Sequence, residues 1–171
     1  MPNAVTHILI AILIASIIRD YIIRDKKKFP LSLVLTAGIA GLLPDIDIPA
    51  YWGLNILAGT AYYEVHRVYT HTLLFALVFV LLALVTTKIK LRKIKLNYFF
   101  WLISLGVVVH ITLDWLLTGN ISPLYPISSY TAPFSPLVYA FNQTLLPGLD
   151  AILLVVWITY IVIKNKINDF I

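Results

Sequence analysis

Five long apolar stretches constrain this chain more than any other feature of its sequence. They cover residues 4 to 18, 30 to 44, 70 to 87, 97 to 117 and 146 to 163. A helix needs roughly 17 to 25 residues to cross a membrane, and the second stretch is the weakest candidate. With 60% hydrophobic and 12% charged residues, the 171-residue chain is too apolar for a soluble domain. The sequence therefore predicts an all-α, multi-pass bundle of about five transmembrane helices, forming a single domain over residues 1–171.

The distribution of basic residues predicts how this bundle is oriented. Twelve of the 13 Lys and Arg residues lie in three segments, 19–28, 88–95 and 164–166. The positive-inside rule makes these segments and the carboxy terminus cytoplasmic, and leaves the amino terminus and segments 45–69 and 118–148 outside. We therefore expect a protein of the plasma (cytoplasmic) membrane. Its basic residues suit anionic lipid headgroups, and we expect no nucleic-acid partner.

The two predicted outer segments are rich in aromatic residues, and segment 118–148 also contains five prolines and no charged residue. Prolines at this density exclude a regular helix across the segment. Aromatic side chains favour the membrane interface, so the segments form either an interfacial belt or a lid that admits a lipid-like substrate. The belt is the simpler interpretation, and it is compatible with a lid. The sequons at Asn120 and Asn142 agree with an outer location.

Histidine and aspartate residues gather near the predicted outer ends of the apolar stretches. They are His7, Asp45, Asp47, His66, His71, His110 and Asp114. Ionisable groups inside membrane spans are costly and usually functional. Because the chain has no cysteine, any metal must be bound by nitrogen and oxygen. This donor set suits zinc first, with manganese or iron as alternatives, and its seven members exceed one tetrahedral shell.

The spacing within each pair predicts how the side chains converge. His110 and Asp114 are four residues apart and share a helix face, although two such residues alone could form a simple hydrogen-bonded pair. Asp45 and Asp47 would point the same way from an extended backbone, or merely cap a loop end.

His66 and His71 converge if His66 lies in a loop and His71 in the first helical turn, with Thr70 as the capping residue. Thr6 could cap the first helix in the same way.

Two further charged residues accompany this set. Arg67 could clamp a phosphate, or it could form a salt bridge to Glu64 or to one of the aspartates. Asp150 opens the fifth stretch and would support the site from outside the ligand shell, or favour a helix amino terminus. A site with several metal ions and a nearby arginine favours phosphoester hydrolysis by metal-activated water. Asp45, Arg67 and Asp114 are the candidate catalytic residues, with an aspartate as base.

At these residues the chain resembles the YdjM-like family of inner-membrane, metal-dependent hydrolases. The family pattern is a leading His, Pro-Asp-x-Asp, His-Arg-x-x-Thr-His-Ser and His-x-x-x-Asp. It reads here as His7, Pro44 to Asp47, His66 to Thr72 and His110 to Asp114. Pro133-Phe134 also matches the family, whereas Thr72 replaces its serine and the usual glycine of the first helix is missing.

The resemblance implies that the seven His and Asp residues are metal ligands or catalytic groups. The family is distantly similar to the zinc-dependent phospholipase C and P1 nuclease group, which implies phosphoester cleavage. We therefore expect a phosphoesterase acting on a lipid or lipid-linked phosphate at the outer membrane face.

The alternative function is non-catalytic. The same cluster could be a structural metal or polar site in a subunit or scaffold of a membrane complex, with partner membrane subunits. An ion transporter fits less well, because the polar groups lie at one face of the bundle.

Overall fold

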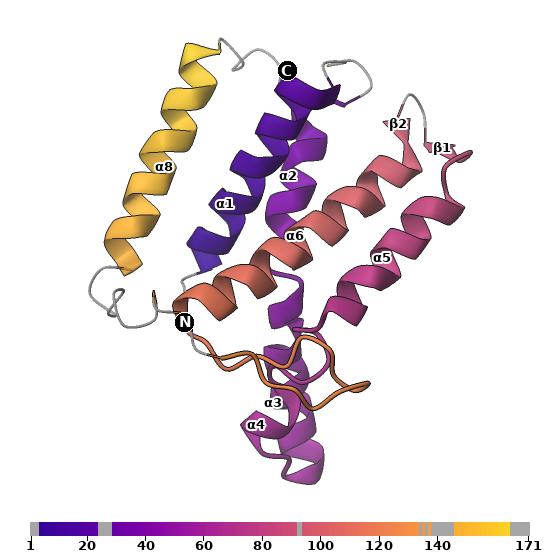
Figure 1. Cartoon of the computed structure of the whole chain (residues 1–171), viewed down its shortest axis with the longest axis vertical. Helices are drawn as coiled ribbons and strands as arrows, with labels where there is room; N and C mark the ends of the chain where they lie inside the picture. Colours follow the sequence, from indigo (N-terminus) through magenta and orange to yellow (C-terminus); the bar gives the residue numbers. More distant parts are fainter. Residues whose placement is uncertain are drawn as a thin grey trace.

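The computed structural model describes residues 4–23, 29–91, 94–133, 135, 137 and 146–164, apart from the side chains of Glu64, Leu91, Leu146 and Pro147. Within this part of the chain the fold is helical, with one pair of two-residue strands (Figure 1). The elements are α1 (Ala4–Ile17), a π-helical turn (Ile18–Ile23), α2 (Leu31–Ala40), a 3₁₀ turn (Pro44–Ile46), α3 (Asp47–Ala58), α4 (Tyr62–Val65), α5 (Leu73–Val85), β1 (Lys90–Leu91), β2 (Ile94–Lys95), α6 (Leu96–Leu117) and α8 (Leu146–Ile163).

Two helices are long and apolar enough to cross a membrane. Ala4–Ile23 has 20 residues and Leu96–Leu117 has 22. The bent pair Leu31–Ala40 and Pro44–Ala58, with an angle of 49°, forms a third candidate span. The prediction of an apolar, all-helical membrane protein is confirmed, with two to three candidate spans among the described residues. Leu73–Val85 and Gly148–Ile163 are apolar but shorter.

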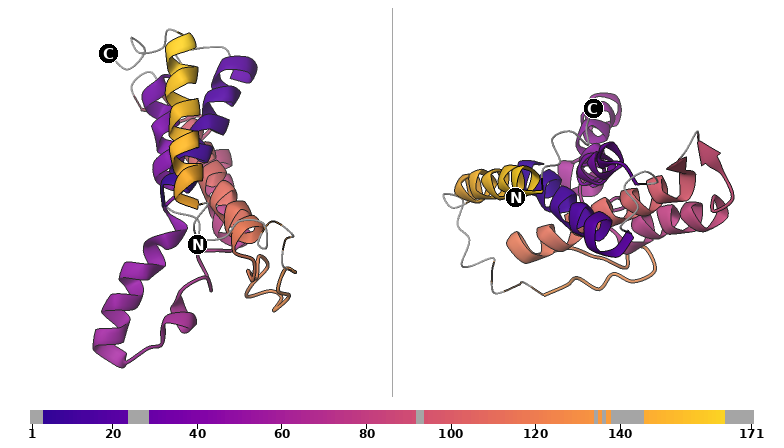
Figure 2. Two further views of the ribbon diagram at one scale, coloured as in Figure 1. Left: turned by 90° about the vertical axis from the view of Figure 1, so that its left-hand side faces the viewer. Right: turned by 90° about the horizontal axis from the view of Figure 1, so that it is seen from above.

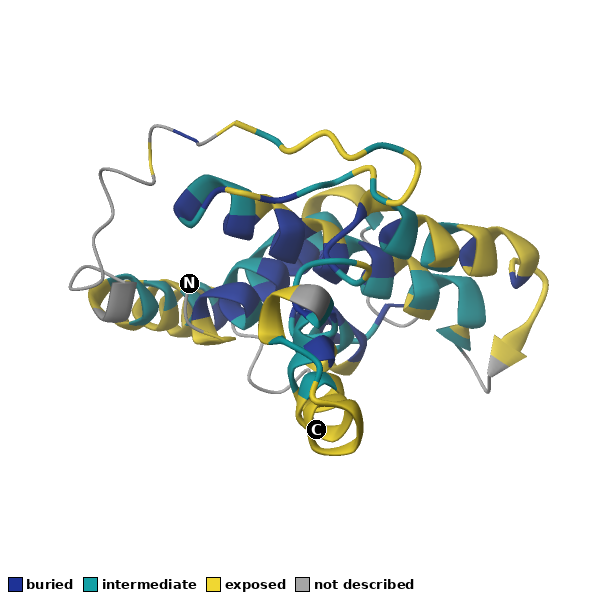
Figure 3. Cartoon of the chain, turned by 90° about the horizontal axis from the view of Figure 1, so that it is seen from below, coloured by how far each residue is buried: buried dark blue, intermediate teal, exposed yellow. Residues whose placement is uncertain are grey.

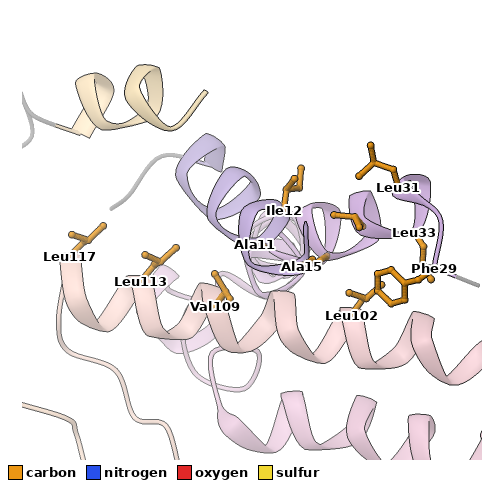
Figure 4. Close-up of a cluster of buried hydrophobic side chains, with 12 residues drawn as sticks. Ala11, Ile12, Ala15, Phe29, Leu31, Leu33, Leu102, Val109, Leu113 and Leu117 are labelled. Carbon is orange, nitrogen blue, oxygen red and sulfur yellow. The ribbon is translucent and has the colours of Figure 1, made fainter. Parts of the chain in front are cut away.

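Helix α6 lies at the centre of the bundle. It packs against α5 on one side and against α1 and α2 on the other, while α8 packs against α1 (Figure 1). Ala11, Ala15 and Leu102 belong to the largest buried apolar cluster, which fills the space between α1, α2 and α6 (Figure 4). Small residues allow these helices to approach closely, as is common in membrane bundles. A Cβ atom at Gly106 would lie 2.5 Å from the carbonyl oxygen of Ala37.

The helix that begins with α2 breaks before the two aspartates. Gly41 ends α2, and Pro44–Ile46 forms a 3₁₀ turn that leads directly into α3. The predicted extended backbone at Asp45 and Asp47 is therefore wrong: Asp47 has helical angles, φ −67° and ψ −21°. Proline stabilises the first turn of a helix, which explains why Pro44 starts a new helical segment here.

Much of the predicted outer segment 45–69 is helical. Helices α3 and α4 project away from the bundle as a hairpin (Figure 2). The side chains of Trp52, Ile56 and Leu57 on α3 are exposed. Buried residues concentrate in the middle of the molecule and exposed ones along the peripheral segments (Figure 3).

The part of segment 118–148 that the structure describes up to residue 133 contains no helix, as its prolines predict. Two hydrogen bonds tie it to the bundle, from Leu73 N to Pro123 O and from Trp115 Nε1 to Pro133 O, and a third, from Ala132 N to Ile121 O, lies within the segment. Phe134 and the sequon at Asn142 lie outside the described residues. So do Arg24, Lys26, Lys27, Lys28, Arg92, Lys93 and Lys166, which contributed to the predicted orientation.

Candidate metal centre

The seven predicted His and Asp residues meet beside the break between α2 and α3. Three groups have donor atoms within 4.8 Å of one another: His7, His110 and Asp114; Asp45, His71 and His110; and Asp47, His66 and His71. Because His71 and His110 each belong to two groups, the three sets form one continuous cluster. The ligands come from α1, the 3₁₀ turn, the start of α3, the turn before α5, and α6.

The Nε2 atoms of His71 and His110 face each other at the centre of this cluster, 3.1 Å apart. Asp45 Oδ1 lies 3.5 Å from the first nitrogen and 3.6 Å from the second. Asp114 Oδ2 lies 3.5 Å and 3.8 Å from the same two atoms. Bonds of about 2.0 Å to a tetrahedral ion place its ligands about 3.3 Å apart. Asp45, His71 and His110 are therefore spaced as three ligands of one ion would be, and Asp114 lies at a similar distance from both imidazoles.

The other ring nitrogens of both histidines are already engaged. His110 Nδ1 lies 2.6 Å from the Gly41 carbonyl oxygen, which can only accept a hydrogen bond, so Nδ1 carries the proton. His71 Nδ1 lies 3.3 Å from Asp47 Oδ2. A partner at Nδ1 fixes the ring orientation and leaves the Nε2 lone pair for a metal, as is usual for metal-binding histidines. No pattern in the sequence indicates that the Gly41 carbonyl contacts His110, and the sequence analysis did not predict this contact.

Asp47 holds the turn that carries the two neighbouring histidines. Its carboxylate is 2.9 Å from His66 Nδ1, and it accepts hydrogen bonds from Arg67 N at 3.0 Å and Thr70 Oγ1 at 2.8 Å. The structure thus confirms that His66 and His71 converge, with ring centroids 5.1 Å apart.

The predicted cap of α5 is wrong. Helix α5 begins at Leu73, and its capping residue is Thr72, whose hydroxyl accepts a hydrogen bond from Phe75 N. His71 therefore precedes the helix instead of lying in its first turn. Thr70 instead binds Asp47, and its hydroxyl also lies 3.1 Å from His71 Nδ1. The presence of Thr70 in the motif could have suggested a polar contact, but the sequence does not indicate that Asp47 is the partner.

His7 reaches the cluster from α1. Its ring stacks on His110 with centroids 3.9 Å apart, and its Nε2 lies 3.6 Å from Asp114 Oδ1. Thr6 lies inside α1, so its predicted capping role is wrong; its hydroxyl donates a hydrogen bond to Asp150 of α8. Asp150 thus contacts the neighbour of a predicted ligand and belongs to none of the three donor groups.

Arg67 contacts the cluster through Asp114. Its Nη2 lies 2.8 Å from Asp114 Oδ2 and 3.1 Å from Thr118 Oγ1. The salt bridge to an aspartate, one of the predicted alternatives, is therefore present, whereas the Glu64 side chain lies outside the described part. Arg67 has a φ of 66°, a left-handed conformation that is costly for a residue with a side chain. The hydrogen bond from its backbone N–H to Asp47 helps to hold this conformation.

The charges of the cluster favour a divalent cation. With neutral histidines, three carboxylates face one guanidinium, which leaves an excess of two negative charges. Buried charges are costly unless a counter-ion is present. Several buried atoms also have no hydrogen-bond partner among the described residues, including Asp45 Oδ1, Asp114 Oδ1, His7 Nδ1 and His66 Nε2. The residues therefore fit a metal site by both charge and free donor atoms.

A polar pocket of about 380 Å³ borders the cluster. It is lined by Tyr62, Tyr63, His66, Arg67, Val68, Asn120 and Ser122. Arg67 Nε is buried and has no hydrogen-bond partner among the described residues. The pocket thus brings hydrogen-bond donors from two separate segments beside His66, a member of the cluster.

Comparison with protein families identifies one match. The family model described as YdjM inner membrane protein matches residues 1–168, which include every residue of the cluster. No curated protein and no solved structure matches the chain. The expected distant similarity to zinc-dependent phospholipase C and P1 nuclease has no support in these comparisons and stays a prediction.

Proposed function

The chain belongs to the YdjM inner membrane protein family, and from this membership and the His/Asp cluster we propose that it is a membrane-bound, metal-dependent phosphoesterase. Its substrate is a lipid or lipid-linked phosphate at the outer membrane face. The observation that carries the proposal is the convergence of two Nε2 atoms 3.1 Å apart with two carboxylates. Their distances and fixed ring orientations suit a metal ion, with zinc as first choice.

We assign the innermost ligand positions to Asp45, His71, His110 and Asp114. His7 and His66 flank this set with unpartnered nitrogens and could bind a further ion. Asp47 was predicted as a ligand, but its oxygens already contact His66, Arg67 and Thr70. Such contacts are typical of the carboxylates that orient metal-binding histidines, so we propose that Asp47 positions the ligands.

A divalent ion bound there supplies Lewis-acid polarisation of a phosphoryl oxygen and activation of water. Asp45 is the better candidate for the base, because its side chain is 23% exposed whereas that of Asp114 is fully buried. Arg67 borders the polar pocket and has a free Nε donor, which suits it to bind the phosphate. Thr118 and Asp114 hold the guanidinium in place for this contact.

The proposal includes a five-span arrangement, with the amino terminus outside and the carboxy terminus cytoplasmic. Successive long helices run in alternating directions: α1, α5 and α8 one way, and α2 and α6 the other (Figure 1). The ends of α1 and α8, the start of α2 and the strands β1 and β2 lie in the upper part of Figure 1. Most of the basic residues are close to these points in sequence, which supports the predicted orientation.

A structural role is the second candidate. His71, His110 and Asp114 are fully buried, and a metal site closed by its protein ligands holds helices together without catalysis. The partial exposure of Asp45 and the polar pocket beside Arg67 favour an open site.

Metal content of the purified protein tests the proposal. Wild type is compared with His110→Ala and Asp45→Ala by elemental analysis, together with hydrolysis of phospholipid and polyprenyl phosphate substrates. We expect stoichiometric zinc or manganese in wild type and loss of both metal and hydrolysis in the variants.

Asp150→Asn is the matched control, because it removes a carboxylate outside the three donor groups and keeps an oxygen acceptor for Thr6. This variant is expected to retain its metal. Bound metal without hydrolysis of any phosphoester would leave the structural metal site. Folded protein that binds no metal would contradict the phosphoesterase and leave a structural polar site.

A further inference from the structure

A second opening reaches the cluster beside the helix break. An apolar groove of about 460 Å³ is lined by Ala4 of α1, by Ile39, Leu42 and Leu43, and by Asp45 and Ile46 of the 3₁₀ turn. Asp45 is the single charged member of this lining. The groove therefore joins an aliphatic surface directly to a carboxylate whose Oδ1 lies 3.5 Å from His71 Nε2.

The two openings differ in chemistry and in the elements that form them. The polar pocket lies between α4, the following turn and residues 120–122, and offers Arg67, Asn120 and Ser122. The apolar groove lies between the first turn of α1 and the end of α2, and offers aliphatic carbon. A small water-soluble phosphoester would contact the first opening and would have no partner in the second. A molecule with a phosphate between a polar and an apolar part matches both.

The groove also opens where hydrocarbon is available. Its outer members Ile39 and Ile46 are 73% and 56% exposed. Both lie on the bent pair of helices that forms a candidate span, next to the first turn of the candidate span Ala4–Ile23. Exposed aliphatic residues on a membrane-spanning surface contact lipid chains, and irregular backbone within a membrane is tolerated where it lines a cavity. The break between α2 and α3 fits that description.

We propose that the apolar groove holds the hydrocarbon chain of a membrane lipid whose phosphate lies at the His/Asp cluster, with its head group in the polar pocket. This inference rests on the proposed phosphoesterase function and specifies how its substrate enters. The hydrocarbon chain of the lipid enters sideways from the bilayer and passes Ile39 and Ile46. The junction between this hydrocarbon chain and the phosphate lies at Asp45. Long-chain phosphates are therefore expected to bind more tightly than short-chain ones with the same head group.

Photolabelling of the full chain tests the groove. The protein is reconstituted in phosphatidylcholine nanodiscs with zinc, and the probe is dodecyl phosphate with a diazirine near the end of its chain. Labelled residues are located by mass spectrometry. We expect saturable labelling within residues 39–46, reduced at least tenfold by excess unlabelled dodecyl phosphate.

Two exposed isoleucines provide a matched pair of variants. Ile39→Trp places a large ring in the groove, whereas Ile56→Trp makes the same change on α3, at a side chain that is 83% exposed. Since both positions are exposed, both variants should fold. Labelling of residues 39–46 should fall at least tenfold in Ile39→Trp and stay within twofold of wild type in Ile56→Trp.

Three outcomes would overturn the proposal that the groove binds lipid: labelling spread over the lipid-exposed helices, labelling that resists competition, and labelling that falls equally in both variants. Metal content and hydrolysis of soluble bis(p-nitrophenyl) phosphate are measured on the same samples. Wild type and Ile56→Trp should retain both, and Ile39→Trp should retain its metal, because its side chain belongs to none of the donor groups. Failure of the groove with intact metal and hydrolysis is thereby distinguished from failure of the proposed function.

Discussion

Thr70 lies within the cluster without belonging to any of its three donor groups. Its hydroxyl donates a hydrogen bond to Asp47 and also lies 3.1 Å from His71 Nδ1. Thr70→Val keeps the shape of the side chain and removes the hydroxyl. Because contacts behind the ligands orient them, loss of such a partner typically lowers metal affinity by about 10–100-fold. We expect a loss of this size in zinc affinity, measured by competition with a chelator of known affinity.

The control for this substitution is Thr112→Val on α6. The Thr112 hydroxyl donates to the Val108 carbonyl of its own helix and contacts no member of the cluster. Zinc affinity should be unchanged. If both valine variants bind zinc as tightly as wild type, Thr70 does not orient the site.

At the residue scale, the sequence predicted the members of the cluster well. Motif spacing and the cost of burying ionisable groups were sufficient to select seven residues that converge in space. The backbone around them was predicted less well, as Thr70 and the extended strand at Asp45 show. Capping and turn geometry depend on where each helix starts, and a shift of two residues moves the cap from Thr70 to Thr72. Contacts to the Gly41 carbonyl depend on tertiary packing and leave no mark in the sequence.

At the scale of elements, the contact between α2 and α6 positions His110 against the break. A Cβ atom at Gly106 would lie 2.5 Å from Ala37 O and 2.8 Å from the Ala40 carbonyl carbon. Backbone atoms cannot move aside as a side chain can, so Gly106→Ala forces the two helices apart. We expect it to destabilise the protein by about 1–3 kcal/mol, as overpacking does, and to weaken zinc binding. Thermal unfolding in detergent and chelator competition measure the two effects.

Gly53→Ala is the matched control on α3. Apart from the neighbouring residues and backbone of its own helix, no atom of the described residues lies within 4 Å of a Cβ built at Gly53. Alanine is favoured over glycine inside a helix by about 0.5–1 kcal/mol. This variant should therefore be as stable as wild type or slightly more so. An equal loss of stability in both variants would contradict the tight approach at Gly106.

The sequence predicted some elements closely and one incorrectly. The stretch 97–117 became α6 and the stretch 146–163 became α8, almost residue for residue. The stretch 30–44 instead ends at Gly41, and the next helix continues to Ala58. Hydropathy marks apolar residues but does not report where a helix bends. At the bend, Pro44 starts a new helical segment, and Gly41 approaches α1 so closely that a Cβ would lie 2.9 Å from the His7 carbonyl oxygen.

For the whole molecule, the absence of cysteine from the sequence makes its orientation straightforward to test. Ser129→Cys and Thr87→Cys each introduce one thiol at an exposed position. Residue 129 lies in a segment predicted to be outside, and residue 87 ends the apolar stretch 70–87, next to the predicted cytoplasmic segment 88–95. A membrane-impermeant maleimide added to intact cells should label residue 129 and not residue 87. This result follows from the positive-inside rule.

Lysed cells provide the control, because both cysteines should then react. Labelling of residue 87 in intact cells, with residue 129 protected, would reverse the orientation. The cluster would then open toward the cytoplasm. The sequence predicts this property through the positive charges of its loops.

The length of α2 has a consequence for how water reaches the proposed site of hydrolysis. Its 10 residues rise about 15 Å, half of a hydrocarbon core of about 30 Å. In the five-span arrangement the Gly41 break and the imidazoles beside it therefore lie in the outer half of the bilayer, below its headgroups. A lipid at this level has not left the bilayer, so hydrolysis there requires water to travel inward. The protein would then have to provide a path by which water reaches the lipid within the bilayer.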